Sequence, residues 1–259
     1  MLKDRGIEGR IIPTGQPGVH SDELGDSINA ALALGMTPNH SVPSVNLWHL
    51  NDMAKFAGST RIGYTIFEMP TFDARERNSV DNLDTVWVPS EWAKEVVLNN
   101  NPDARCQVVP CGVDTDIFCP SDEPPHFKDD YFHTFVNIGK FEKRKGHELV
   151  FESMRLLGTT QTKPIRLLIN CTNPFLGDFA TVLKNQLNSR GFNLNESDRG
   201  EHTARFRHSE NPNDCVIDII TAGGLTSDSI AEVYRSGDNG LFPYFAEGWN
   251  LPLIECMSC

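Results

Sequence analysis

The sequence has no long hydrophobic run. None of its apolar stretches approaches the roughly 20 consecutive residues that a helix needs to cross a bilayer. The N-terminus, Met1 to Gly6, also lacks the apolar segment of a signal peptide. We therefore expect a cytoplasmic protein with no transmembrane segment.

Cysteine and positive charge are both in short supply. Seven cysteines, an odd number at irregular spacings, favour a reducing compartment over a disulfide scaffold. Acidic side chains outnumber basic ones by 35 to 23, which gives a formal net charge of −12. Nucleic acids and anionic membranes repel so acidic a chain, and neither is expected as a partner.

The rest of the composition is that of a globular protein. Hydrophobic residues make up 39% of the chain and charged residues 22%. A length of 259 residues is enough to bury a sizeable core and to form two modest domains.

In the first half of the chain, short apolar segments alternate with helical patterns. A helix is expected after the capping residue Ser90. Strands are expected at 44–48, 61–67, 85–88 and 106–109. The alternation predicts an α/β fold with parallel, doubly wound sheets, in which ligands bind beyond the carboxyl ends of the strands. That rule places His49, Asp52 and Glu68 on the functional edge.

The second half repeats this alternation. It begins after Cys119 to Asp130, a segment rich in proline and acidic residues that we interpret as an interdomain linker. Strands are expected at 134–138, 165–170 and 214–220, and helices at 147–157, 174–189 and 226–234. The sequence thus predicts two Rossmann-like domains, at 1–120 and 131–259.

A basic loop follows the first strand of the second half. The strand ends at Gly139, and the next residues include four cations within six positions, Lys140 to Lys145. A strand that ends at glycine, a basic loop and a helix start together favour phosphate binding. By charge alone, a solvated basic loop is an equally good interpretation.

The last stretch carries two carboxylates, Glu247 and Glu255, with seven residues between them. Gly248 allows a tight turn, Asn250 is a good helix cap, and Pro252 suits the first helical position. We expect free N–H groups near 250–252 to attract an anion such as a diphosphate, and the carboxylates to accept hydrogen bonds from sugar hydroxyls. The alternative is an exposed helix start with two solvated acids.

This stretch resembles the E-x7-E signature of family 4 retaining glycosyltransferases, which have the GT-B fold. The family's usual form is E-G-F-G-L-P-x-x-E-A-M-A, and here Trp249 and Asn250 stand in place of Phe and Gly. The basic loop is similar to the family's G-R-x-x-x-x-K-G motif, with Lys140 in place of the arginine. Further landmarks are Tyr64 to Glu68, Leu83 to Ser90 and Val109 to Asp114. The family's glycine-rich loop near the N-terminus has no convincing counterpart.

The resemblance implies roles for individual residues. Glu247 would contact the donor sugar, and Lys145 and Lys140 would stabilise the departing diphosphate, although a lysine at 140 lacks the bidentate fork of arginine. Glu255 would hold the nucleotide ribose. The full set of implied donor-binding residues is Gly139, Gly248, Trp249, Asn250, Leu251 and Glu255. His49, Asp52 and Glu68 are candidates for the acceptor side.

The expected function is therefore that of a metal-independent, retaining hexosyltransferase. It would use a nucleotide-sugar co-substrate and no separate cofactor, with a glycan, a lipid or a small molecule as acceptor. The family's C-terminal domain continues further, so the resemblance predicts an incomplete C-terminal domain here. A non-catalytic nucleotide-sugar-binding remnant is the alternative from another class. An epimerase or phosphorylase on the same architecture is a third reading, although nothing signals the pyridoxal-phosphate lysine of a phosphorylase.

Overall fold

The computed structural model describes residues 6, 9–12, 22–35, 39–160, 162–200, 202–221 and 225–259. The chain divides into two compact units. The first consists of Met1–Ile66 and Pro70–Val109, and the second of Phe67–Met69 and Pro110–Cys259. The linker expected at Cys119 to Asp130 falls within the second unit. The domain limits 1–120 and 131–259 stay a prediction.

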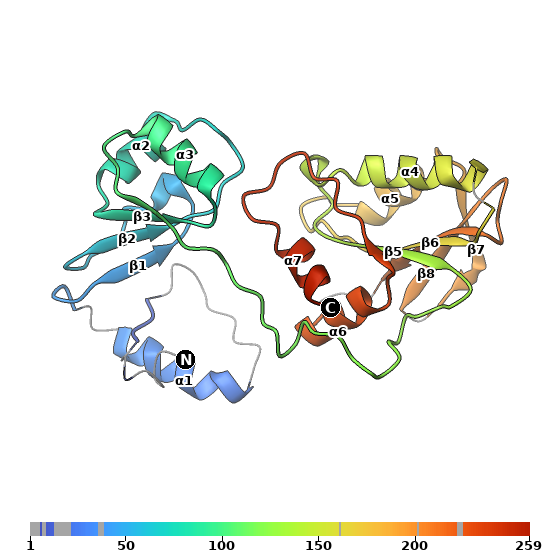
Figure 1. Ribbon diagram of the computed structural model, residues 1–259, viewed down its shortest axis with the longest axis horizontal. Coiled ribbons are helices and arrows are strands. Elements are labelled where there is room, and N and C mark those ends of the chain that lie inside the picture. Colours follow the sequence, from blue (N-terminus) through green and yellow to red (C-terminus); the bar gives the residue numbers. More distant parts are fainter. Residues whose placement is uncertain are drawn as a thin grey trace. The chain divides into compact units, whose positions relative to one another are not determined.

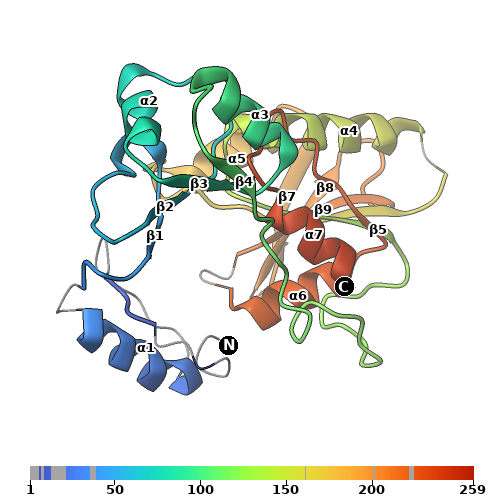
Figure 2. The same cartoon turned by 60° about the vertical axis from the view of Figure 1, so that its left-hand side comes forward.

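The first unit contains a four-stranded parallel sheet with strand order β1-β2-β3-β4. Helices α2 and α3 lie on one face of this sheet (Figure 2). The elements are α1 (Asp22–Gly35), β1 (Ser44–Leu47), η2 (Leu50–Asp52), β2 (Arg61–Tyr64), α2 (Ala74–Asp81), β3 (Thr85–Val88), α3 (Glu91–Asn100) and β4 (Cys106–Val108). The four strands lie where the sequence predicts them.

Side-chain caps define where these helices begin. The Ser90 hydroxyl accepts a hydrogen bond from the Ala93 N–H and starts α3. Helix α2 begins with a reciprocal capping box between Asp73 and Glu76. This helix was not among the expected elements, although the spacing of Asp73 and Glu76 is a recognisable start signal.

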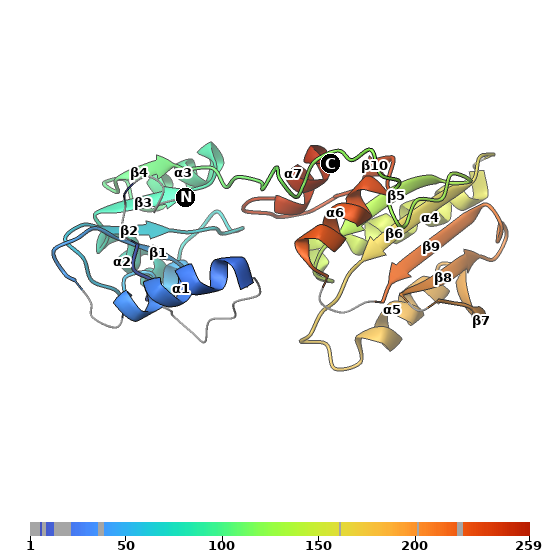
Figure 3. The same ribbon diagram turned by 90° about the horizontal axis from the view of Figure 1, so that it is seen from below.

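The second unit contains a six-stranded sheet with strand order β10-β5-β6-β9-β8-β7 (Figure 3). Strands β10, β5, β6 and β9 pair with one another in parallel, whereas β8 pairs antiparallel with both of its neighbours, β9 and β7. The elements are β5 (His133–Ile138), η3 (Lys143–Lys145), α4 (His147–Thr160), β6 (Ile165–Asn170), α5 (Phe179–Asn188), β7 (Phe192–Arg199), β8 (Thr203–His208), β9 (Cys215–Ile220), α6 (Ser227–Arg235), β10 (Asn239–Gly240) and α7 (Leu251–Ser258).

The order of these strands reverses at β5. The chain proceeds outward from β5 to β6 and β9, and then returns past β5 to form β10 on its other side. In open α/β sheets, ligands bind at the carboxyl ends of the strands where such a reversal occurs. The topology of the second unit therefore singles out the loops that follow β5 and β10.

Two apolar clusters cover the two faces of the second sheet. One joins side chains of α4 and α5 to the sheet and includes the fully buried Phe151, Leu187 and Ile217. The other joins α6 to the opposite face and includes Val136 and Ala231. Each buried side chain of this size contributes about 1.5–3 kcal/mol relative to an exposed one. The helices on the two faces are seen in Figure 1.

Strands β7 and β8 form an antiparallel pair that the sequence analysis did not predict. Residues Phe192–Arg199 carry mostly polar side chains, so the segment lacks a clear apolar alternation. The pairing is also irregular, with a register shift between Leu194 and Arg199. A cross-strand ion pair from Arg207 to Asp198 supports it, with two hydrogen bonds of 3.0 and 2.9 Å.

A histidine is enclosed at the start of α4. His147 is only 2% exposed and lies against the aromatic rings of Phe141 and Phe151. Within the described part of the chain, neither of its ring nitrogens has a hydrogen-bond partner. Burial in this apolar setting lowers the pKa of His147 from 6.5 to about 4.

This burial predicts a pH-dependent contribution to stability. The unfolded chain binds a proton on His147 at a higher pH than the folded chain does, so the contribution is complete above about pH 6.5 and is lost as the pH falls towards 4. The loss should reach at most about 3 kcal/mol. Urea unfolding from pH 7 to 4 should show a smaller loss of stability for His147→Leu than for wild type. His202→Leu, at an exposed histidine, should follow wild type; equal pH dependence of all three proteins would refute the prediction.

Candidate functional site

The loops that follow β5 and β10 lie against each other. The Leu241 N–H donates to the Val136 carbonyl at 2.9 Å, and the Phe245 N–H donates to the Arg144 carbonyl at 2.8 Å. The basic loop and the segment that carries Glu247 are thus joined at the point where the strand order reverses. The sequence predicts both stretches as parts of one site, and the structure brings them together.

The basic loop turns on a glycine. Residues Lys143–Lys145 form the short helix η3, which ends at Gly146 in the left-handed conformation with φ of 69°. A Cβ atom at this position would lie 2.3 Å from the carbonyl oxygen of Pro243. Both the backbone angle and the close approach therefore require glycine.

A continuous series of charges of alternating sign connects the two loops. Lys140 Nζ lies 2.5 Å from Glu142 Oε1, and the other oxygen of Glu142 accepts from Arg144 Nε at 3.0 Å. Arg144 Nη1 lies 3.2 Å from Glu247 Oε2, and the same oxygen accepts from Lys145 Nζ. Arg144 Nη2 also lies 3.4 Å from Glu68 Oε1, so three cations and three carboxylates balance in this network.

Lys145 lies at the buried end of the network. The residue is 6% exposed, and its Nζ is 4.1 Å from the centroid of the Tyr244 ring. The Tyr244 hydroxyl donates to the Ile138 carbonyl at 3.1 Å and so fixes the ring beneath the ammonium group. Burial, with the nearby charge of Glu247, raises the pKa of Tyr244, which therefore stays neutral.

Lys140 lies at the exposed end of the network. Its ammonium group pairs with Glu142, and the hydrogen bond from Lys140 is the main reason that the pKa of Glu142 is lowered. The same ammonium group is 4.5 Å from the centroid of the Phe175 ring, a side chain that is 82% exposed. Lys140 and Lys145 therefore reach the network from opposite ends, and neither touches the other.

The start of α7 differs from the sequence prediction. Asn250 caps the helix as expected, with its side-chain oxygen accepting from the Leu253 N–H at 3.2 Å. The helix begins at Leu251, so Pro252 occupies the second helical position rather than the first. The expectation of free N–H groups across 250–252 is wrong at two positions, because the Leu251 N–H donates to the Trp249 carbonyl and proline has no N–H.

Donors remain available just before the helix. Within the described residues, the backbone N–H groups of Gly248, Trp249 and Asn250 have no acceptor in the protein. The indole N–H of Trp249 is buried and also has no acceptor there. A ligand with acceptor oxygens would satisfy these groups, and for the buried indole N–H it would remove a desolvation penalty.

Glu255 lies on a separate element from the charge network. Its carboxylate accepts a hydrogen bond from the Tyr234 hydroxyl at 3.3 Å, and burial raises its pKa. Helix α7 packs against β10, where a Cβ on Gly240 would lie 2.8 Å from Cys256 Sγ. In the part of the chain that the structure describes, neither a hydrogen bond nor an ion pair joins Glu255 to Glu247 or Lys145.

The acceptor-side candidates stay predictions. His49 precedes η2 and makes an edge contact with Trp48, with ring centroids 5.6 Å apart. Asp52 pairs at 2.6 Å with both Lys55 and Arg75, and the hydrogen bond from Lys55 is the first cause of its lowered pKa. Glu68 belongs to the short segment Phe67–Met69 of the second unit, and its Oε1 lies 3.4 Å from Arg144 Nη2 of the charge network.

Three side chains in or beside the network, those of Glu142, Arg144 and Tyr244, were not singled out from the sequence. Arg144 links Glu142 to Glu247, and its position within the basic run was the available signal. Tyr244 supports Lys145, and nothing in the local sequence distinguishes it from the neighbouring aromatic residues.

Several solved structures share the fold of this chain. An apo structure of OtsA covers 90% of this chain, with a TM-score of 0.63 and 13% identity. The trehalose-6-phosphate structure from E. coli with bound UDP-2-fluoro glucose covers 91%, with a TM-score of 0.62 and 12% identity. A TarM mutant from S. aureus in complex with UDP covers 83%, with a TM-score of 0.53 and 13% identity. No protein-family profile and no curated sequence matches the chain.

The chain therefore has the Rossmann-like GT-B fold of glycosyltransferases, which confirms the predicted resemblance and fold class. At these identities the likeness concerns the fold. The chain spans 59% of the length of the OtsA and E. coli chains and 39% of the TarM chain. No helix in the described ranges is long and apolar enough to cross a membrane.

The close approach of Gly146 to Pro243 predicts that adding one methyl group at position 146 destabilises the fold. Gly146→Ala should lower the free energy of unfolding by about 1–3 kcal/mol or more, because it combines a positive φ with a clash against backbone. Gly177→Ala is the matched control, since a Cβ there meets nothing within 4 Å. Chemical denaturation should separate the two variants clearly; similar stabilities would show that the loop relaxes without cost.

Proposed function

We propose that the protein is a retaining glycosyltransferase that uses a nucleotide-sugar donor, bound in the second unit at the loops after β5 and β10. One observation carries the proposal. The basic loop and Glu247 form one charge network where the strand order reverses, and its members Lys145 and Glu247 are 102 residues apart in sequence. That position in an open α/β sheet is where ligands bind.

The charge of the network suits a nucleoside diphosphate leaving group. Cleavage of the sugar–phosphate bond builds negative charge on the diphosphate, and preorganised cations stabilise that charge. Lys145 and Arg144 are already fixed by Glu247, so they need little reorganisation during the reaction. The N–H groups of Gly248, Trp249 and Asn250 add neutral donors beside them.

The two glutamates would divide the recognition of the donor. Glu247 is held by two cations and would orient the sugar at the bond that breaks. Glu255, on α7, would accept hydrogen bonds from the ribose hydroxyls. UDP is the nucleotide bound in the TarM structure and UDP-2-fluoro glucose the sugar nucleotide in the E. coli structure, so UDP-glucose is a reasonable first donor to test.

The acceptor would be a glycan, a lipid or a small molecule. His49, Asp52 and Glu68 are the candidates to face it. Because Lys145, Arg144 and Lys140 supply the positive charge for the leaving group, the reaction should proceed without a divalent metal.

Substitutions at the site should separate binding from chemistry. Glu255→Ala removes contacts that change little along the reaction, so it should raise KM for the donor with little effect on kcat. Glu247→Ala and Lys145→Met should lower mainly kcat. Each should cost roughly ten- to a hundredfold in kcat/KM, the size of a hydrogen bond to a charged group. Steady-state turnover of UDP-glucose is the measurement.

Exposed neighbours provide matched controls for these variants. Lys143→Met and Glu148→Ala change charges next to the site without touching the network. A fall in kcat for Glu255→Ala together with a pure KM effect for Glu247→Ala would reverse the assigned roles. Donor binding by calorimetry without any turnover would instead favour a non-catalytic nucleotide-sugar-binding protein.

The stereochemical course is a separate expectation. The product should keep the anomeric configuration of the donor, and EDTA should leave the rate nearly unchanged because the lysines carry the leaving-group charge. Proton NMR of the first product formed tests the configuration. An inverted product, or loss of activity in EDTA that Mg²⁺ restores, would contradict this mechanism.

A further inference from the structure

A polar cavity lies in the second unit, along the face of the sheet that carries Arg166, Leu168 and Asp218. It has a volume of about 420 Å³ and is open to solvent. Its lining includes Arg166 near the start of β6, whereas the charge network described above follows the far end of β5. The other charged or hydroxyl-bearing residues of the lining are Lys128, Asp129, Asp130, Thr203, Arg205 and Asp218.

Arg166 forms the floor of this cavity. It is 4% exposed, its Nε donates to the Thr134 hydroxyl at 3.1 Å, and its Nη2 donates to the Phe127 carbonyl at 2.6 Å. Its remaining nitrogen, Nη1, lies 3.7 Å from Asp218 Oδ2, which is beyond hydrogen-bond reach. Burial lowers the pKa of Arg166, so its charge is held in an unfavourable setting.

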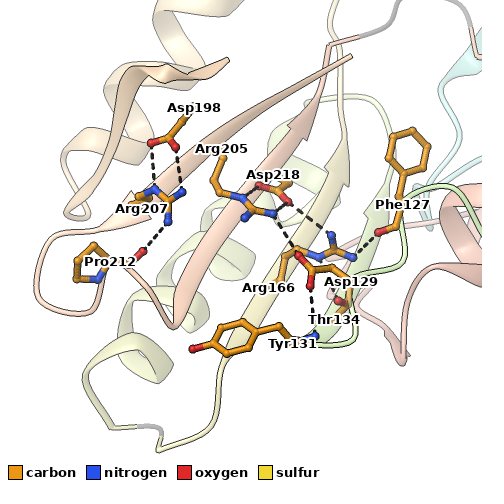
Figure 4. Close-up of polar contacts among 10 residues, drawn as sticks. All are labelled: Phe127, Asp129, Tyr131, Thr134, Arg166, Asp198, Arg205, Arg207, Pro212 and Asp218. Atoms are coloured by element: carbon orange, nitrogen blue, oxygen red, sulfur yellow. Dashed lines mark hydrogen bonds and ion pairs between the residues drawn. The ribbon is translucent and has the colours of Figure 1, made fainter. Parts of the chain in front are cut away.

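Asp218 is already committed to another arginine. Arg205 Nε and Nη2 donate to the two oxygens of Asp218, each at 2.8 Å, in a bidentate pair (Figure 4). Two guanidinium groups therefore share one buried carboxylate, and the second carboxylate within 4 Å of them, that of Asp129, is partly exposed. A bound anion could take the place of that partly exposed carboxylate.

Asp129 supplies the second carboxylate near the two arginines. Its Oδ2 lies 3.7 Å from Arg205 Nη2, and its side chain is 34% exposed. It comes from the loop before β5 rather than from the sheet, and it accepts a hydrogen bond from the Tyr131 N–H at 3.2 Å. Lys128 lies at the same cavity but pairs with Asp238 at 2.9 Å.

We propose that this cavity binds the phosphate group of a small phosphate monoester between Arg166 and Arg205. The phosphate would replace the Asp129 carboxylate as a partner of Arg205. Guanidinium groups match phosphate oxygens in geometry and charge, and the Thr203 hydroxyl is a further donor in the lining. A cavity of 420 Å³ lies in the range of small-molecule sites, so it has room for the organic part of the ligand.

The proposal predicts opposite changes in affinity for two substitutions in the lining. Asp129 competes with the phosphate, so Asp129→Asn should tighten binding by about five- to tenfold. Arg205→Gln removes a charged donor and should weaken binding at least tenfold. Arg207→Gln is the matched control, because Arg207 pairs with Asp198 on the neighbouring strands and does not line the cavity.

The measurement is calorimetric titration of the whole chain with glycerol 3-phosphate. Inorganic phosphate tests the anion alone, glycerol the organic part alone, and glycerate a carboxylate of similar size. The titration is repeated in the Lys145→Met variant, since phosphate that binds at the donor site should be lost there and phosphate in this cavity should not. Failure of donor turnover would leave this result intact.

The expected result is binding of glycerol 3-phosphate that strengthens in Asp129→Asn, weakens in Arg205→Gln and is unchanged in Arg207→Gln. If Arg205→Gln lowers the melting temperature too far, Arg205→Lys keeps the charge, loses the fork and should also bind more weakly. Absence of binding to wild type and to Asp129→Asn would overturn the proposal and leave the cluster as ion pairs only. Equal affinity for glycerate would overturn the assignment to phosphate.

Discussion

The contact of Lys145 and Arg144 with Glu247 is the interaction on which the candidate site depends. It ties the loop after β5 to the loop after β10 through side chains. A buried lysine is tolerated there because a carboxylate and an aromatic ring surround it. The backbone hydrogen bonds from Leu241 to Val136 and from Phe245 to Arg144 hold the same two loops together, so the charged groups meet on a fixed backbone.

The same arrangement gathers cations at one point of an acidic protein. The net charge of −12 describes the whole chain, whereas any bound group meets only its neighbours. In the network from Lys140 to Lys145 and Glu247, each cation lies within 4 Å of a carboxylate, and Arg144 also pairs with Glu68 at 3.4 Å. The acids within it also hold the cations in place, because a flexible lysine or arginine loses side-chain entropy on ordering.

Much of this fold could be predicted from the sequence because strand and loop signals are local. The apolar runs from Ser44 to Ile220 marked most strands, and glycine with clustered cations marked the loop after β5. The β7–β8 pair was missed because β7 carries mostly polar side chains, and strand pairing depends on partners far away in sequence. The donation of the Leu251 N–H to Trp249 could not be predicted either, since it depends on the detailed path of the turn. The bridging by Arg144 is set by side chains about 100 residues distant.

The position of β10 also has a consequence for the order in which the protein folds. Asn239 pairs with Phe135, so the site needs two segments that are more than 100 residues apart in the chain. Contacts of such high sequence separation close slowly, because the intervening chain must first be ordered. During synthesis, β5, α4 and β6 emerge well before β10. The basic loop is therefore made early, and it acquires Glu247 only after β10 has been synthesised, so the complete charge network is a late product of folding.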